Sequence, residues 1–171
     1  MSKQKVRTDY DRSAFCYEKR YTALQWEKYE IMIDIPLEGR ILDLGCGTGL
    51  LASFLYKNEG TLIGDYTIFG VDISLNMLQR AKPREAVIQA DIDFLPFRNN
   101  VFDVVLSFTS LQNLPSLDYV FTEVRRVLKP GHPFIFSVLQ KEDSPLITKK
   151  VGHFFTVSKR VCGEDVGFIC I

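Results

Sequence analysis

Asp43-Leu44-Gly45-Cys46-Gly47-Thr48-Gly49 is the stretch of the chain that decides its fold. It follows a short apolar run, residues 41–44, and precedes residues 49–58, whose apolar spacing is that of a helix. Glycine at alternate positions lets the backbone turn tightly from strand to helix. It also leaves the N–H groups of the helix N-terminus uncovered, so a ligand can lie against the backbone. The stretch therefore predicts a ligand-binding loop inside a β-α-β unit.

The next expected strand, residues 68–71, ends in a carboxylate. Asp72 stands where a carboxylate can accept hydrogen bonds from both hydroxyls of a ribose. The dinucleotide fingerprint Gly-x-Gly-x-x-Gly/Ala, counted from Gly45, would need glycine or alanine where this chain has Leu50. The spacing favours a nucleoside ligand and disfavours a nicotinamide-dependent oxidoreductase.

Strand-like and helix-like segments alternate along the whole chain. We expect strands at residues 41–44, 68–71, 86–90, 102–108 and 134–139, and a final hairpin from residues 153–161 and 166–171. We expect helices at residues 23–35, 49–58, 74–82 (capped by Ser74) and 144–151, and one after Pro115. The alternation predicts an α/β fold: a doubly wound, mainly parallel seven-stranded sheet ending in an antiparallel β-hairpin.

Composition limits the class of protein. The 171 residues correspond to about one domain, and 46% hydrophobic with 25% charged residues is usual for a globular protein. The 21 basic and 21 acidic residues cancel, so we expect no strong stand-alone nucleic-acid binding. No apolar run reaches the roughly 18 residues of a membrane helix. The four cysteines form no Cys-x-x-Cys pair, so we expect no metal site and place the protein in the reducing cytoplasm.

These segments resemble a known family. Asp43-x-Gly45-x-Gly47-x-Gly49 is similar to motif I of the class I S-adenosylmethionine-dependent methyltransferases, which have a Rossmann-like fold. Their other motifs resemble, in order, Gly70-Val-Asp72-Ile-Ser74, Gln89-Ala-Asp91-Ile92, Phe102-Asp103-Val-Val and Leu128-Lys-Pro-Gly131. The resemblance runs over residues 40–139.

The resemblance implies one methyltransferase domain over residues 1–171, with S-adenosylmethionine as cofactor. Residues 1–39 would form an N-terminal helical cap, 40–139 the cofactor-binding core and 140–171 the C-terminal hairpin. The cofactor-binding residues that it implies are Asp43, Gly45, Cys46, Gly47, Gly49, Asp72, Ile73, Asp91, Ile92 and Ser107.

A narrower resemblance concerns the flanking segments. Tyr10-Asp11, Tyr17-Glu18 and Tyr21 resemble the tyrosine-rich N-terminal segment of small ubiquinone-biosynthesis-like methyltransferases. Gln25-x-x-Lys28-Tyr29 and Ser110-Leu-Gln112-Asn113-Leu114 look like a set of small, mostly archaeal methyltransferases. Some relatives of that kind work with a small zinc-binding activator protein, which is therefore a possible partner here. The loop after the fourth strand lacks the Asn/Asp-Pro-Pro-Tyr/Phe signature, which argues against adenine-N6 or glutamine-amide methylation of the familiar kind.

The acceptor side is expected beyond the carboxyl ends of the strands, where ligands of such sheets bind. Gln112 and Asn113 lie there and could orient a polar acceptor, although they could equally cap a loop. Tyr21, with Tyr17, could close over the methyl group or merely pack a helix on the sheet. Methyl transfer from a sulfonium is an in-line displacement that depends mainly on positioning, so no dedicated base is required. His132 and His153 are expected away from this edge.

Two functions from different classes remain open. The first is a methyltransferase acting on an unidentified acceptor, either a small molecule or an RNA or protein presented with a partner subunit. The second is a catalytically silent binding or regulatory subunit that keeps the fold. We also expect the third strand, residues 86–90, to be a sheet edge that could accept a strand from a partner.

Overall fold

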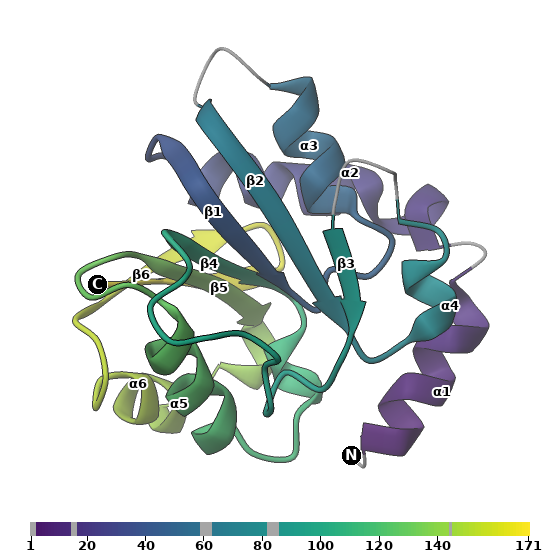
Figure 1. The fold of residues 1–171 in the computed structure, drawn as a ribbon. Helices are drawn as coiled ribbons and strands as arrows, with labels where there is room; N and C mark the ends of the chain where they lie inside the picture. Colours follow the sequence, from purple (N-terminus) through teal and green to yellow (C-terminus); the bar gives the residue numbers. More distant parts are fainter. Residues whose placement is uncertain (1–2, 15–16, 59–62, 82–85, 144) are drawn as a thin grey trace.

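The computed structural model describes residues 3–14, 17–58, 63–81, 86–143 and 145–171, and within them the chain forms one seven-stranded sheet flanked by helices (Figure 1). The strands are β1 (Leu37–Leu44), β2 (Ile63–Asp72), β3 (Ala86–Gln89), β4 (Val104–Phe108), β5 (Phe134–Leu139), β6 (Val157–Cys162) and β7 (Asp165–Cys170). The helices are α1 (Lys3–Ser13), α2 (Tyr17–Met32), α3 (Leu50–Lys57), α4 (Leu75–Leu78), α5 (Asp118–Val127) and α6 (Pro145–Val151), with 3₁₀ turns η1 (Leu111–Asn113) and η2 (Gln140–Glu142).

The strand order is β3-β2-β1-β4-β5-β7-β6. Pairs among β1 to β5 are parallel, whereas β7 pairs antiparallel with both β5 and β6. The predicted architecture, a doubly wound parallel sheet with a terminal antiparallel hairpin, is confirmed. The prediction that β3 is an edge strand is confirmed as well. No helix in the described part of the chain is long and apolar enough to cross a membrane.

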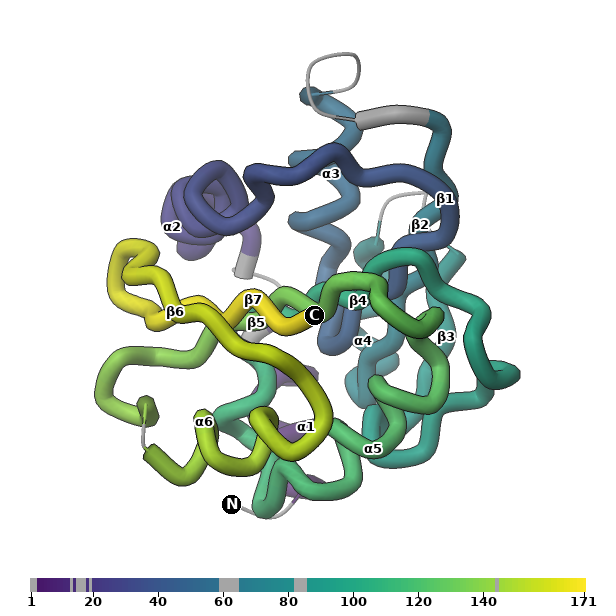
Figure 2. Tube along the Cα trace, turned by 90° about the vertical axis from the view of Figure 1, so that its left-hand side faces the viewer, coloured from purple at the N-terminus to yellow at the C-terminus, as the bar shows by residue number. Residues whose placement is uncertain are grey.

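Alternating side chains of the strands supply two cores, one on each face of the sheet. One core joins the apolar stripe of α5 and α6 to residues such as Leu42 and Val105. The other joins α2 and α3 to their neighbours Ile41 and Val104. Figure 2 shows α2 and α3 on one side of the sheet and α5 and α6 on the other. This two-faced burial explains why β4 and β5 are apolar except for one serine each, Ser107 and Ser137.

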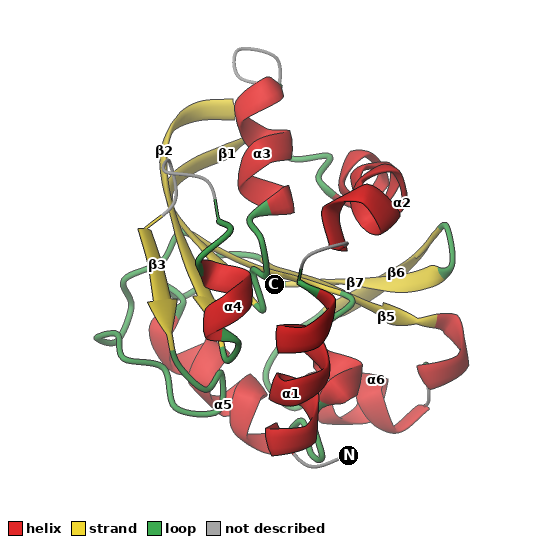
Figure 3. Cartoon of the chain, turned by 90° about the vertical axis from the view of Figure 1, so that its right-hand side faces the viewer, coloured by secondary structure: helices red, strands yellow, loops and turns green. Residues whose placement is uncertain are grey.

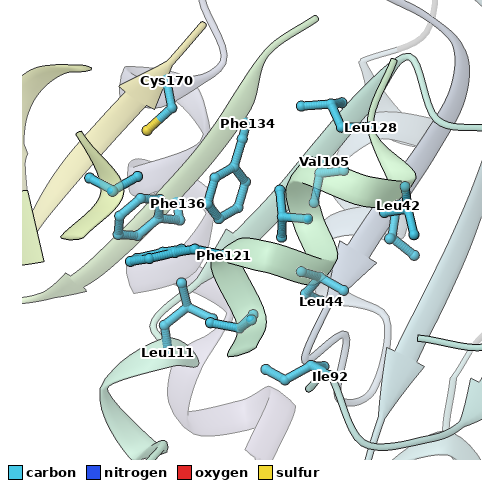
Figure 4. Packing of buried hydrophobic residues seen from close by; sticks show 14 of the residues in the cluster. Leu42, Leu44, Ile92, Val105, Leu111, Phe121, Leu128, Phe134, Phe136 and Cys170 are labelled. Carbon is cyan, nitrogen blue, oxygen red and sulfur yellow. The ribbon is translucent and has the colours of Figure 1, made fainter. Parts of the chain in front are cut away.

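Aromatic rings fill the core under α5. Phe134 and Phe136 stack with centroids 4.9 Å apart, and Phe136 stacks on Phe168 at 4.5 Å. Phe121 of α5 lies against both β5 rings (Figure 4). Because the rings come from β5, β7 and α5, they tie the antiparallel hairpin to the parallel part of the sheet.

The N-terminal segment differs most from the prediction. The single helix expected at residues 23–35 is α2, which begins at Tyr17 and ends at Met32, and a further helix, α1, precedes it. Helix α1 packs beside α4 at the carboxyl edge of the sheet (Figure 3). Its residues are mostly polar, so its sequence lacks the apolar stripe by which a core-facing helix is recognised.

Other boundaries differ as well, and β1 and β2 begin at Leu37 and Ile63 rather than at residues 41 and 68. The helix expected at residues 74–82 is the single turn α4, although the predicted cap is confirmed because Ser74 Oγ accepts the N–H of Met77 at 3.2 Å. The end of that expected helix lies outside the described residues. The hairpin begins at Val157 rather than at residue 153, since His153 belongs to the turn that follows α6.

Candidate cofactor and acceptor site

The glycine loop joins β1 to α3 at the carboxyl edge of the sheet. Gly45, Gly47 and Gly49 have φ angles of 76°, 57° and 77°, in the left-handed region that only glycine adopts at low cost. The N–H groups of Gly45 and Cys46 donate to Val71 O at 2.7 and 3.1 Å, which fixes the loop against β2. A Cβ atom added to Gly47 would meet nothing within 4 Å. The loop backbone at Gly47 therefore faces open space that a ligand could occupy.

Asp72 closes β2 beside this loop. Its Oδ2 accepts the N–H of Gly47 at 2.9 Å, and its Oδ1 accepts the N–H of Ser74 at 2.8 Å. Burial raises the pKa of Asp72, and hydrogen bonds from the backbone N–H groups of Ser74, Gly47 and Ile73 partly offset this rise. A carboxylate can accept about four hydrogen bonds, so capacity remains for ribose hydroxyls.

Helix α1 lies over Asp91, the acidic residue that follows β3. Lys3 Nζ binds both oxygens of Asp91, at 2.8 and 2.7 Å, and also contacts the Asp93 carboxylate. Further along the helix, the Asp11 carboxylate accepts the Ser74 hydroxyl. These contacts hold α1 across the carboxyl ends of β2 and β3.

A first cavity lies between α1 and the glycine loop. Most of the predicted cofactor residues line it: Gly45, Gly47, Asp72, Ile73, Asp91 and Ile92. Its volume is about 60 Å³, below the ~300 Å³ at which ligand pockets begin. Three residues of α1 take part in the wall, Lys3, Val6 and Tyr10. The position of α1 is therefore what limits the space.

The other predicted cofactor residues lie behind this wall. Asp43 and Cys46 are buried, and Gly49 forms the N-cap of α3. Ser107 is fully buried, and its hydroxyl donates to Leu44 O at 2.9 Å, so the structure does not bring it to the cavity as the sequence suggested. Ser107 is buried whichever face it points to, because every residue of β4 is buried and both faces of the sheet are covered. From these positions the four residues can support the glycine loop, but they do not line the cavity.

A second cavity, of about 920 Å³, opens next to the first. Two of the predicted acceptor residues, Gln112 of η1 and Tyr21 of α2, line this cavity and not the first. The third, Asn113, lines both. Tyr17 begins α2, but its side chain lies outside the part of the chain that the structure describes.

The two cavities share part of their walls, formed by Val6, Tyr10, Thr109 and Asn113. Asn113 Nδ2 donates to the Tyr10 hydroxyl at 3.0 Å, and burial is the main cause that raises the pKa of this phenol. The sequence places Tyr10 in the tyrosine-rich segment, but Tyr21 was the tyrosine predicted for the acceptor side. An apolar stripe along α1 could have pointed to Tyr10. The helix has no such stripe, because it covers a polar edge of the sheet and not a core.

Thr109 is an unusual residue of the shared wall. It follows β4 directly and has a φ of 52°, which is uncommon for a β-branched side chain. Its hydroxyl accepts from Lys28 Nζ at 2.9 Å and donates to Asp165 Oδ2 at 2.7 Å. Such strained positions persist only where surrounding contacts fix them, and they gather at functional sites.

The histidines lie away from these cavities. His132 Nδ1 is 2.9 Å from the carbonyl oxygen of Asp103, just before the amino end of β4. His153 follows α6. The expectation that His132 stands at the opposite end of the sheet is confirmed, and neither histidine lines either cavity.

Comparison with known proteins identifies the family. The methyltransferase domain family matches residues 42–136. An uncharacterized protein of Methanocaldococcus jannaschii is 34% identical over an aligned length of 182 residues. The alignment covers 96% of this chain and 68% of that protein. The malonyl-acyl-carrier-protein O-methyltransferase of Erwinia pyrifoliae is 32% identical over 145 residues, which cover 81% of this chain but only 53% of that enzyme. The chain thus spans about half the length of that characterised relative.

Among solved structures, a putative methyltransferase of Haloferax volcanii, in complex with the Trm112 methyltransferase activator, has the same fold. Its TM-score is 0.81 at 19% identity, over 97% of this chain and 96% of that chain. This chain therefore belongs to the class I S-adenosylmethionine-dependent methyltransferase family. S-adenosylmethionine is the cofactor that membership implies. The open loop backbone at Gly47 and the Asp72 carboxylate suit its ribose chemically, whereas the cavity of about 60 Å³ beneath α1 is smaller than a ligand pocket of ~300 Å³.

Proposed function

We propose that the protein transfers the methyl group of S-adenosylmethionine, bound in the first cavity, to an acceptor bound in the second. The observation that carries this proposal is the shared wall, because it joins a nucleoside-type site to a larger cavity at Tyr10, Thr109 and Asn113. An in-line displacement needs donor and acceptor on one axis, and holding them there supplies much of the rate enhancement.

On the cofactor side, Asp72 would bind the ribose hydroxyls, and the backbone of Gly45 and Gly47 would carry the remainder of the nucleoside. Ile73, Asp91 and Ile92 would flank the adenine. Asp43, Cys46, Gly49 and Ser107 would keep the loop and strand ends in place. The first cavity is small beneath α1, so cofactor binding would move this helix outward and release Lys3 from Asp91.

On the acceptor side, Asn113 and Gln112 would orient the acceptor, and Tyr21 would form part of the cavity wall. The acceptor is proposed to be a small molecule, or part of an RNA or protein presented by a partner subunit. The second cavity lies within the ~300–1,000 Å³ range of small-molecule sites, which favours an acceptor or acceptor group of that size.

Calorimetric titration with S-adenosylhomocysteine tests the cofactor site. We expect micromolar binding, and a loss of about tenfold or more in Asp72→Ala, equivalent to about 1.4 kcal/mol. Asp65→Ala is the matched control, because Asp65 is an exposed carboxylate on the same strand, outside both cavity walls. Absence of both heat and thermal shift in the wild-type protein would refute the proposal and favour a catalytically silent subunit.

We further propose a small zinc-binding activator as partner, because the Haloferax volcanii fold neighbour is in complex with a methyltransferase activator. Edge strand β3 is the surface that we assign to it, since Ala86 and Gln89 are exposed and, among the described strands, β3 pairs only with β2. Purification from the native source tests the partner. An active preparation without any small zinc-containing protein would contradict this assignment, while the methyltransferase proposal would stand.

A further inference from the structure

Two glutamine side chains of the second cavity are fixed on the same residue. Gln25 of α2 directs its Nε2 to the Thr109 hydroxyl, at 3.4 Å. Gln112 of η1 donates its Nε2 to the Thr109 carbonyl oxygen at 2.8 Å. Both glutamines line the cavity, so Thr109 determines where their amide groups lie.

The chemistry of Thr109 decides which end of each amide faces it. The single hydroxyl proton of Thr109 goes to the Asp165 carboxylate, which can only accept, and Lys28 donates to the same oxygen. The Gln25 atom facing that hydroxyl must therefore be the donor nitrogen. The Thr109 carbonyl also only accepts, so the Gln112 atom facing it must be nitrogen too. In both side chains the amide oxygen is therefore the atom that Thr109 does not bind.

These two amide oxygens have no hydrogen-bond partner among the described residues. Gln25 is 5% exposed, so its oxygen has little access to bulk water. Leaving a buried acceptor unsatisfied costs about 1–3 kcal/mol. Both oxygens belong to residues of the cavity wall, and a hydrogen-bond donor that enters the second cavity could satisfy them as the two side chains adjust.

Lys28 adds a donor beside them. Its ammonium group carries three N–H bonds, and Thr109 and Asp165 engage at most two of them. Lys28 and Asp165 form an ion pair at 2.9 Å and cancel in charge. The other charged residues of the wall are exposed and balanced, Arg20 and Lys141 against Asp9 and Glu164. A charged group on the methyl acceptor would therefore gain no net electrostatic attraction from this wall.

We propose that Gln25, Gln112 and Lys28 form the recognition site for the methyl acceptor, and that it binds a neutral group in which an N–H donor adjoins a carbonyl or ring-nitrogen acceptor. Carboxamides, lactams and nucleobase edges have this pattern. The donor side meets the two amide oxygens, and the acceptor side meets the Lys28 ammonium. This inference rests on the proposed methyl transfer, and the recognised group need not carry the atom that is methylated.

Ligand-observed NMR titration in the presence of S-adenosylhomocysteine tests the site. The probes are benzamide, which has the donor–acceptor pattern, and benzoate, which is charged and has only acceptors. We expect benzamide to bind and benzoate to bind about tenfold more weakly or not at all. Benzoate binding as tightly as benzamide would overturn the proposal, as would no benzamide binding to a protein that binds S-adenosylhomocysteine.

Two variants assign the binding to these glutamines. Gln25→Met and Gln112→Met remove the amide at nearly constant volume, and each should weaken benzamide about tenfold. Gln79→Met is the matched control, since Gln79 is exposed at the end of α4 and outside both walls. Unchanged benzamide affinity in both test variants would contradict the assignment. S-adenosylhomocysteine titration of each protein reports folding, and its failure in the wild type would refute the proposed function instead.

The same titration with two further probes separates the sources of such a group. N-acetylglutamine amide represents a protein side chain, and uridine represents a nucleobase. Binding of one of them extends the proposal to that class. Binding of neither, while benzamide binds, assigns the site to small molecules.

Discussion

Lys28→Met is the variant for which the structure gives the clearest expected magnitude. Lys28 and Asp165 are 5% and 0% exposed, and their ion pair at 2.9 Å joins α2 to β7. Removing the ammonium leaves the Asp165 carboxylate buried with two hydroxyl donors, Thr109 and Ser137, each at 2.7 Å. Breaking a buried pair on one side costs about 3–5 kcal/mol. The remaining hydroxyl donors place the expected loss of unfolding free energy near the lower end, about 3 kcal/mol.

Urea unfolding followed by circular dichroism measures this loss, and a double-mutant cycle with Asp165→Asn isolates the pair. The double variant removes both charges, so we expect it to be more stable than the sum of the single losses predicts, by about 2 kcal/mol. Asp143→Asn is the control, because the Lys159–Asp143 pair has the same 2.9 Å distance at 35% and 24% exposure. It should cost less than about 1 kcal/mol. A Lys28→Met cost equal to that of the control would refute the burial argument.

Three further outcomes are expected. Gly47→Ala and Gly131→Ala both place a Cβ at positive φ without a clash, and each should cost about 1 kcal/mol in backbone strain. Only Gly47→Ala should abolish S-adenosylhomocysteine binding in calorimetry. Because burial raises the pKa of Asp72, its carboxylate protonates above the usual range for aspartate. Calorimetric affinity should then fall as the pH is lowered through that raised value, and unchanged affinity would contradict the role of Asp72. Burial also raises the pKa values of Cys162 and Cys170 to about 11 and about 12, so in peptide mapping both thiols should react with a disulfide reagent only after unfolding.

The sheet could be predicted from the sequence because local signals agree there with the fold. The glycine loop, the apolar run of β4 and the amphipathic α5 each show the periodicity or turn chemistry of their element. The strand β5 has the predicted bounds, Phe134–Leu139, because Pro130-Gly131 separates it clearly from α5. The polar helix α1 shows no such signal, since its place is fixed by ion pairs such as Lys3–Asp91 between distant residues.

Residues around the glycine loop could be placed together from the sequence for the same reason. The predicted residues Gly45, Gly47 and Asp72 belong to one β-α-β unit and lie together in one wall. Ser107 shows the limit of this reasoning, because the position after a motif does not say which way a strand residue points. Side-chain direction depends on the register of β4 against its neighbours, and this places Ser107 toward Leu44.

The second cavity, which we propose for the acceptor, depends on contacts that no local pattern contains. Lys28 and Thr109 are 81 residues apart in sequence, and Thr109 and Asp165 are 56 apart. The Thr109 hydroxyl is bound by Lys28 of α2 from one side and by Asp165 of β7 from the other, at the end of β4. The helical segment before β1 and the terminal hairpin, which the sequence suggested as additions to a cofactor-binding core, are therefore what builds the second site. A chain reduced to residues 40–139 would keep the glycine loop and lose Lys28 and Asp165, which both bind the Thr109 hydroxyl.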